Sequence, residues 1–151
     1  MKVSSKCIDL IEASEGFRGT VYRCPADVPT IGFGSTRDTD GKAITMAHPP
    51  ITRAQAVTLM LATLVHYEDA VNRYVIVTIN QNQFDALVDF AYNLGCEALR
   101  GSILIKLVNT EQFIAASNEF DKWTHAAGKV QPGLVKRRLS EKNLFLSHGY
   151  T

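Results

Sequence analysis

The sequence has almost no net charge and no long hydrophobic run. Its 151 residues include 16 Lys and Arg against 15 Asp and Glu, a formal charge of +1. A mixed-charge surface of this kind gives no argument for a nucleic acid or a membrane surface as partner. The strongest apolar run, residues 56–65, is about half as long as a membrane-spanning helix. We therefore expect a globular protein that binds no nucleic acid and spans no membrane.

Cysteine and histidine are also sparse. The three cysteines, Cys7, Cys24 and Cys96, are an odd number and fit no metal-ligand spacing. Such usage is typical of a protein made in a reducing compartment. The four histidines are scattered along the chain. We predict no metal and no other cofactor.

The first residues do not have the pattern of an export signal. Residues 1–7 are mostly polar, and the apolar stretch that begins at Ile8 is interrupted by Asp9 and Glu12. A secretory signal needs an apolar core of about 7–15 residues. The chain is expected to be neither anchored nor self-exporting.

What the sequence does contain is a helical pattern followed by a β-rich one. Residues 4–14 have apolar groups at helical spacing, and Gly16 is expected to end that helix. Residues 17–46 alternate short β-rich stretches with Pro, Gly and Asp, which predicts a small antiparallel sheet. Its strands are expected at 21–22, 30–34 and 43–45, with a turn at 38–41.

The remainder of the chain has helical patterns. Pro49 and Pro50 mark a boundary, and Thr52 with Gln55 has the form of a capping box. This pair predicts a long helix over residues 53–74.

Asn80 can cap the next helix, which Gly95 is expected to end. Further helices are predicted at 102–108, 111–122 and 132–148. The fold class is therefore α+β. We expect one domain over 1–151, with a β-containing lobe at about 15–50 and mainly helical segments at 1–14 and 51–151.

The segment that begins at Glu15 combines three side chains suited to hydrolysis. Glu15 ends the first predicted helix, Cys24 follows nine residues later, and Thr30 six residues after that. These types can supply an acid, a nucleophile or base, and a hydroxyl that orients water. Taken alone, a helix-end glutamate is usually solvated and a strand threonine is often structural.

Cys24 has three interpretations. It could be a small buried apolar side chain, as free cysteines usually are. It could act as a thiolate base or nucleophile, although only a few per cent of an ordinary thiol is ionised at pH 7. In the third, Asp27 on a predicted turn is the base and Cys24 only shapes the pocket. Arg23 precedes Cys24, but adjacent strand residues point to opposite faces.

Three ordered blocks of sequence resemble the lysozyme-like endolysins of tailed phages, the T-even and lambdoid muramidase family. The blocks are Glu15-Gly16 with Cys24 and Thr-Ile-Gly-Phe-Gly at 30–34, Phe-Ala-Tyr-Asn-Leu-Gly at 90–95, and Trp123 with Pro-Gly-Leu-Val-Lys-Arg-Arg at 132–138 and Glu141. Together they cover nearly the whole chain in the order typical of the family.

The resemblance implies a lysozyme-like α+β fold, in which a long helix joins the β-containing lobe to a larger helical lobe. It implies hydrolysis of the β-1,4 bond between N-acetylmuramic acid and N-acetylglucosamine in bacterial peptidoglycan, for host-cell lysis. It also implies a monomer that stays in the host cytoplasm until a separate holin opens the inner membrane, and that then acts in the periplasm.

The resemblance also assigns roles to residues. Glu15 is implied to be the acid, Cys24 the second catalytic residue and Thr30 the hydroxyl that orients water. The implied substrate-binding residues are Asn93, Trp123 and Arg137, and either Arg137 or Arg138 is a candidate brace for the site. Two positions depart from the family pattern, since Cys24 stands where most relatives carry aspartate and Ser35 where histidine is common.

Three other functions remain open from the sequence. A lytic transglycosylase would use the muramic acid 6-hydroxyl in place of water and give a 1,6-anhydro product, and the missing aspartate keeps this alternative open. A thiol peptidase or amidase would pair Cys24 with a histidine such as His48. An inactive wall-binding module would bind peptidoglycan without cleaving it.

Overall fold

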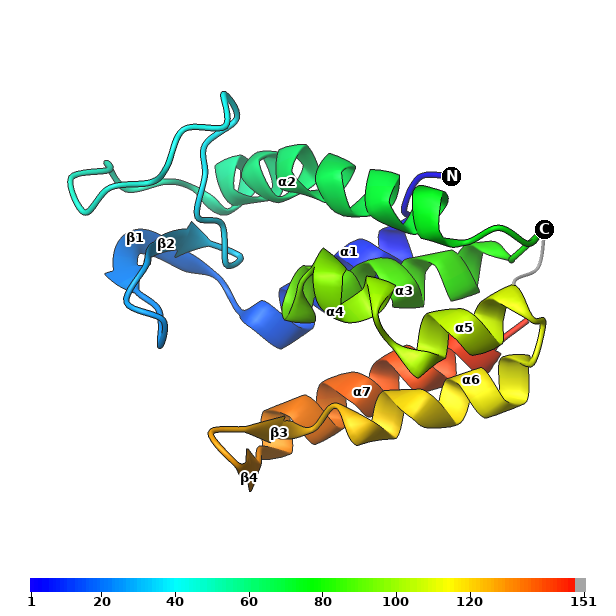
Figure 1. Cartoon of the computed structure of the whole chain (residues 1–151). Coiled ribbons are helices and arrows are strands. Elements are labelled where there is room, and N and C mark those ends of the chain that lie inside the picture. The colour runs from blue at the N-terminus through cyan, green and yellow to red at the C-terminus, as the bar shows by residue number, and fades with distance from the viewer. Residues whose placement is uncertain (149–151) are drawn as a thin grey trace. The chain divides into compact units, whose positions relative to one another are not determined.

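The computed structural model describes residues 1–148 and divides into two compact units (Figure 1). Ile11–His66 forms one unit, and Met1–Leu10 with the chain from Tyr67 onward forms the other. Two helices, α1 (Ser5–Glu15) and α2 (Arg53–Tyr74), contribute residues to both units. Within the described residues, no helix is long and apolar enough to cross a membrane.

The sheet in the unit Ile11–His66 has two strands. β1 (Arg18–Arg23) and β2 (Pro29–Gly32) pair antiparallel, with Tyr22 opposite Thr30. These strands confirm the predictions at 21–22 and 30–34, although the second ends earlier, at its first glycine. A small hydrophobic core lies under the sheet and consists of Ile31, Ile44 and Leu59, with Val21 and Ile51 packed against it.

The predicted strand at 43–45 is wrong. Ala43 pairs with Arg37 only through an isolated bridge. The expected turn before it is present, but the chain turns again at once, where the N–H of His48 donates to the carbonyl of Thr45 at 3.0 Å. A ladder cannot extend between two turns that are so close together.

The two longest helices begin as their sequences predict. At the start of α2, Thr52 Oγ1 accepts from the N–H of Gln55 at 3.2 Å, and Gln55 Oε1 accepts from the N–H of Thr52 at 2.8 Å. Asn80 and Gln83 form the same reciprocal pair at the start of α3 (Gln81–Leu94). Each box satisfies two backbone N–H groups that a helix start leaves open.

A short helix and a hairpin were not predicted. Gly95 ends α3 as expected, but α4 (Cys96–Arg100) begins directly after it. The strands β3 (His125–Ala126) and β4 (Lys129–Val130) form a hairpin whose turn contains two residues with positive φ. Two residues per strand are too few for an alternating pattern to be visible in the sequence.

The other predicted helices are present. They are α5 (Ile103–Asn109), α6 (Phe113–Glu119) with a 3₁₀ turn (Phe120–Lys122), and α7 (Pro132–Leu146). Figure 1 shows α6 and α7 side by side, and α7 also packs on α3. Phe120 lies at the centre of this packing, with its ring centroid 5.8 Å from Phe90 and 5.6 Å from Phe145.

Candidate active site

Glu15 ends α1, where the chain reverses direction. Gly16 follows with φ of +69°, and its N–H donates to the carbonyl of Glu12 at 3.0 Å, which closes the last helical turn. The Glu15 side chain is half-buried. Its Oε2 lies 3.1 Å from the position that a Cβ on Gly34 would occupy. The carboxyl group therefore lies against the backbone of the turn that follows β2.

That turn depends on two glycines. Gly32 and Gly34 have φ of +69° and +82°, values that strain any residue with a Cβ. On either side of the turn, Ile31 and Ser35 exchange two backbone hydrogen bonds of 2.9 Å. The Thr-Ile-Gly-Phe-Gly run is thus a tight turn that brings its second glycine against the carboxyl of Glu15.

Tyr22 and Thr30 share one face of the two-stranded ladder, with Cys24 beside Thr30. Tyr22 and Thr30 are cross-strand partners, and such partners point to the same face. Cys24 directly follows the last residue of β1, and its thiol interacts with the Thr30 hydroxyl.

Tyr22 links Cys24 to Glu15. The pKa of Tyr22 is raised, first by burial, then by the charge of Glu15 and to a smaller extent by that of Cys24. The Arg18 guanidinium, 4.3 Å from the centroid of the Tyr22 ring, acts in the opposite direction. Because one phenol interacts with both groups, the structure brings the three sequence-predicted catalytic residues into one neighbourhood.

The surroundings of Cys24 stabilise a thiolate. Its pKa is lowered, mainly by the backbone N–H of Val28, with smaller contributions from the N–H of Ala26 and the Thr30 hydroxyl, while partial burial opposes them. These N–H groups belong to a turn that the N–H of Asp27 closes by donating to the Cys24 carbonyl at 2.8 Å. A thiolate can act as a base or a nucleophile.

The Thr30 hydroxyl lies beside this sulfur. Thr30 is buried, and its Oγ1 donates to the carbonyl of Val28 at 2.8 Å. A hydroxyl has a single proton, so donation to Val28 and donation to the Cys24 thiolate are alternatives. In either state the lone pairs of Oγ1 can accept a hydrogen bond from a water molecule.

Asp27, the other candidate base, faces solvent. Its side chain is 83% exposed, and its Oδ1 lies 3.5 Å from Nη1 of Arg23. Arg23 also donates to the Asp27 carbonyl at 3.1 Å. A paired carboxylate on the outside of the turn is a weaker candidate than the Cys24 thiol.

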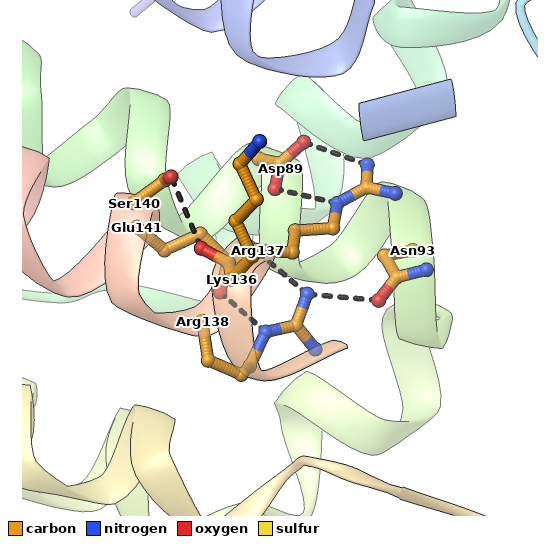
Figure 2. A network of polar contacts seen from close by, with 7 residues as sticks. All are labelled: Asp89, Asn93, Lys136, Arg137, Arg138, Ser140 and Glu141. Carbon is orange, nitrogen blue, oxygen red and sulfur yellow. Dashed lines mark hydrogen bonds and ion pairs between the residues drawn. The ribbon is translucent and has the colours of Figure 1, made fainter. Parts of the chain in front are cut away.

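The sequence-predicted substrate-binding residues belong to the other unit, where charged side chains are buried (Figure 2). Arg137 is 5% exposed, and its Nε and Nη2 donate to the carboxylate of Asp89 at 3.0 and 2.8 Å. Arg138 donates through Nη2 to Asn93 Oδ1 at 2.8 Å and to Glu141 Oε1 at 2.7 Å. The burial of Arg137 supports a bracing role, and its direct contact with substrate stays a prediction.

Burial also controls ionisation in this cluster. It raises the pKa of Glu141, and the neighbouring Asp89 carboxylate raises it further, while the two arginines oppose the shift. Burial lowers the pKa of Arg138, against the charge of Glu141. Glu141 Oε2 and Arg138 Nε lie 2.7 Å apart as an ion pair, and both side chains are fully buried.

Trp123 reaches the same cluster through an aromatic contact. Its half-buried ring packs edge-on against Phe90, with centroids 5.3 Å apart and an interplanar angle of 85°. The Arg138 guanidinium lies 5.2 Å from the centroid of the Phe90 ring. Asn93 and Trp123, two of the sequence-predicted binding residues, are therefore both connected to Arg138.

The sequence did not indicate the position of Tyr22 beside the candidate catalytic residues or the pairing of Arg138 with Glu141. The spacing of two residues between Tyr22 and Cys24 was visible, but the pairing with Thr30 was not. The three-residue spacing on α7 was also visible, whereas its burial was not. Over residues 1–148, no group of three or more His, Cys, Asp or Glu side chains could hold a metal ion.

The comparisons with known proteins agree with this fold. A family model described as phage lysozyme matches residues 12–141. The endolysin of Bacillus phage B103 is 40% identical over 154 residues, which cover 97% of this chain and 55% of the relative. The endolysin of Salmonella phage P22 is 36% identical over 147 residues, which cover 97% of this chain and 99% of the relative.

A solved structure, the endolysin from Escherichia coli O157:H7 phage FAHEc1, matches with a TM-score of 0.89 and 35% identity, covering 100% of this chain and 97% of that one. This likeness confirms the predicted α+β fold of the lysozyme class. The chain belongs to the phage lysozyme family. It spans about half the length of the Bacillus phage endolysins B103 and PZA, at 55% and 56%.

Proposed function

We propose that this chain is an endolysin that hydrolyses β-1,4 bonds between N-acetylmuramic acid and N-acetylglucosamine in bacterial peptidoglycan. One observation carries the proposal: in a member of the phage lysozyme family, Tyr22 interacts electrostatically with both Glu15 and Cys24 and stands opposite Thr30. Glycoside hydrolysis requires one group that protonates the leaving oxygen and a second that activates water or attacks the sugar. Glu15 and Cys24 can fill these two roles, and the Thr30 hydroxyl can orient the water.

In the proposed reaction, Glu15 donates its proton to the glycosidic oxygen while the bond from that oxygen to the anomeric carbon breaks. A water held by Thr30 attacks the anomeric carbon, and the Cys24 thiolate takes the proton that the water loses. If the sulfur attacks the sugar instead, water later releases the covalent intermediate. The first route inverts the anomer and the second retains it, so NMR of the first product distinguishes them.

Asn93, Trp123 and Arg137 are proposed to serve substrate binding. An amide can bond to sugar hydroxyl and acetamido groups, and an indole ring offers an apolar face for a sugar ring. Arg137, which is buried against Asp89, would act mainly by holding α3 and α7 in place.

The biological role is host-cell lysis. We propose a monomer that stays in the host cytoplasm, crosses the inner membrane when a separate holin opens it, and then acts in the periplasm. We further propose that both compact units fold as one domain over 1–151. Expression alone should then leave Escherichia coli turbidity unchanged until the inner membrane is permeabilised, and calorimetry of the pure protein should give one transition.

The decisive experiment is mass spectrometry of the fragments that wild type and Glu15→Gln release from purified peptidoglycan. Muropeptides with new reducing ends from wild type alone would support the proposal. Anhydro ends would replace it with a lytic transglycosylase. New free amines without glycan fragments would indicate a peptidase or amidase, and binding without any product would indicate an inactive wall-binding protein.

A further inference from the structure

The buried polar network on α3 and α7 includes Asn93, one of the sequence-predicted substrate-binding residues (Figure 2). We propose that Arg138, held by Glu141, is the positioning residue for a glycan-binding face formed by Asn93 and Trp123. The inference rests on the proposed function, because it takes these two residues to be the ones that contact the glycan.

Glu141 fixes the Arg138 guanidinium in place. The two residues are three positions apart on α7, and both are fully buried. Nη2 donates to Oε1 at 2.7 Å, and Nε lies 2.7 Å from Oε2 as an ion-pair contact that is not a hydrogen bond. One hydrogen bond and one close ion-pair contact, both in a buried environment, hold the planar guanidinium in position. The direction of the second proton on Nη2 is therefore set by Glu141, and it points to Asn93 (Figure 2).

That contact determines which way the Asn93 amide faces. A guanidinium can only donate, so the atom 2.8 Å from Arg138 Nη2 must be the carbonyl oxygen Oδ1. The amide nitrogen then lies on the side away from the arginine, as Figure 2 shows, and Asn93 is half-buried. A fixed donor pair at a partly open position suits an acceptor such as the carbonyl oxygen of an N-acetyl group.

The same guanidinium supports the aromatic part of the face. Its Nη1 is buried with no hydrogen-bond partner among the described residues, and the group lies 5.2 Å from the centroid of Phe90. The Trp123 ring packs edge-on against the same Phe90 ring, with the two centroids 5.3 Å apart. The planar Arg138 guanidinium thus orients the Asn93 amide directly and supports the Trp123 indole through Phe90. Lysine, with a single point charge, could not make both contacts.

The test measures binding without cleavage. In the Glu15→Gln background, co-sedimentation with purified peptidoglycan sacculi gives the dissociation constant of N93A, R138K and the double variant. We expect N93A and R138K each to weaken binding by about 3- to 10-fold, as for one lost hydrogen bond. If Arg138 acts through Asn93, R138K in the N93A background adds less than about 2-fold. If R138K weakens binding by the same factor with and without N93A, the two losses are additive and the inference is overturned.

A matched control and a spectroscopic readout separate positioning from general destabilisation. Arg100 pairs with Glu97 at the same three-residue spacing but on the surface, so R100K should leave binding unchanged. Trp123 is the only tryptophan, and we expect R138K to shift its emission in the free protein whereas R100K does not. An unshifted spectrum together with unchanged binding in R138K would also overturn the inference.

If R138K does not fold, E141Q takes its place, because glutamine keeps an acceptor oxygen for Nη2 but loses the charge; coupling of E141Q to N93A supports the inference and additivity overturns it. The proposed function is tested separately by wild-type cleavage. Glycan fragments from wild type with additive N93A and R138K losses overturn only the inference, whereas no fragments from wild type overturn the proposed function.

Discussion

The two compact units hold their polar groups in place by different means. In Ile11–His66 the backbone does so: a glycine turn lies against the carboxyl of Glu15, and N–H groups of a tight turn stabilise the thiolate of Cys24. In the other unit, buried charged side chains hold one another, as in the pair of Arg138 and Glu141. The first unit should therefore be sensitive to added atoms, and the second to lost charges.

The largest effect is expected from Glu15→Gln, in the unit built on backbone contacts. Glutamine preserves the shape of the side chain but cannot donate the proton, and loss of a general acid typically costs about 10²- to 10⁴-fold. The measurement is the rate of reducing-end release from peptidoglycan, with the melting temperature as control. A variant that keeps most of its activity would contradict the assignment of the acid.

The next effect concerns Cys24. We expect Cys24→Ala to lose nearly all activity and Cys24→Asp to keep a substantial part of it. Only the deprotonated group can accept a proton, so wild-type activity should fall as the pH drops through the thiol pKa, which lies below its ordinary value. In Cys24→Asp this fall should move to lower pH, because a carboxyl ionises near pH 4.

The pH–rate profiles of the three proteins test this role of Cys24. An active Cys24→Ala variant, or an aspartate variant whose profile coincides with that of wild type, would show that another group is the base.

A matched pair of glycines tests the sensitivity of the first unit to added atoms. Gly34 and Gly41 share a φ of +82°, but only a Cβ at Gly34 meets Glu15, at 3.1 Å from Oε2, while Gly41 has open space. Both alanine variants should lose about 1–2 kcal/mol of unfolding free energy from backbone strain. Only Gly34→Ala should also lose activity, by about 10-fold or more.

Urea unfolding and peptidoglycan turnover of the two glycine variants provide the measurement. Equal activity in both would show that the approach of Gly34 to Glu15 has no part in the reaction.

The smallest effect is the pH dependence of stability that Glu141→Gln should remove from the second unit. The pKa of Glu141 is raised in the folded protein, so the folded state binds more protons than the unfolded state above about pH 4.3. The contribution of this group to stability therefore decreases as the pH rises from about 4.3 through the pKa of Glu141 in the folded protein. Glutamine does not titrate, so the melting temperature of the variant should rise relative to wild type, by a few degrees, between pH 4 and pH 8.

Melting curves across this pH range check the effect, with the surface residue Glu97 changed to glutamine as control. A difference between Glu141→Gln and wild type that is independent of pH would mean that Glu141 has an ordinary pKa in the fold.

Features that depend on neighbouring residues were predictable from the sequence, and features that depend on distant ones were not. The capping boxes at Thr52 and Asn80 set the starts of α2 and α3 because all their atoms lie within one helical turn. The strand at 43–45 failed because its pairing is cut short by a turn that no local pattern marks. Cys24 was found through a motif. Tyr22 was missed because its position opposite Thr30 comes from strand register.

The buried pair on α7 illustrates a second limit. Two adjacent arginines and a glutamate three positions later are what an exposed helix face usually shows. Only the packing of α7 on α3 removes them from water, and this is a property of the tertiary structure.

The three cysteines should differ in reactivity, because only Cys24 lies in a turn whose hydrogen bonds stabilise its thiolate. Burial raises the pKa of Cys7 and of Cys96, whereas the pKa of Cys24 alone is lowered. Alkylation proceeds through the thiolate. A reagent such as iodoacetamide, used in limiting amount on the folded protein, should therefore modify Cys24 first, and peptide mapping would show it. The chain thus has a native attachment point for a single covalent label, at one of the residues proposed to cleave the wall.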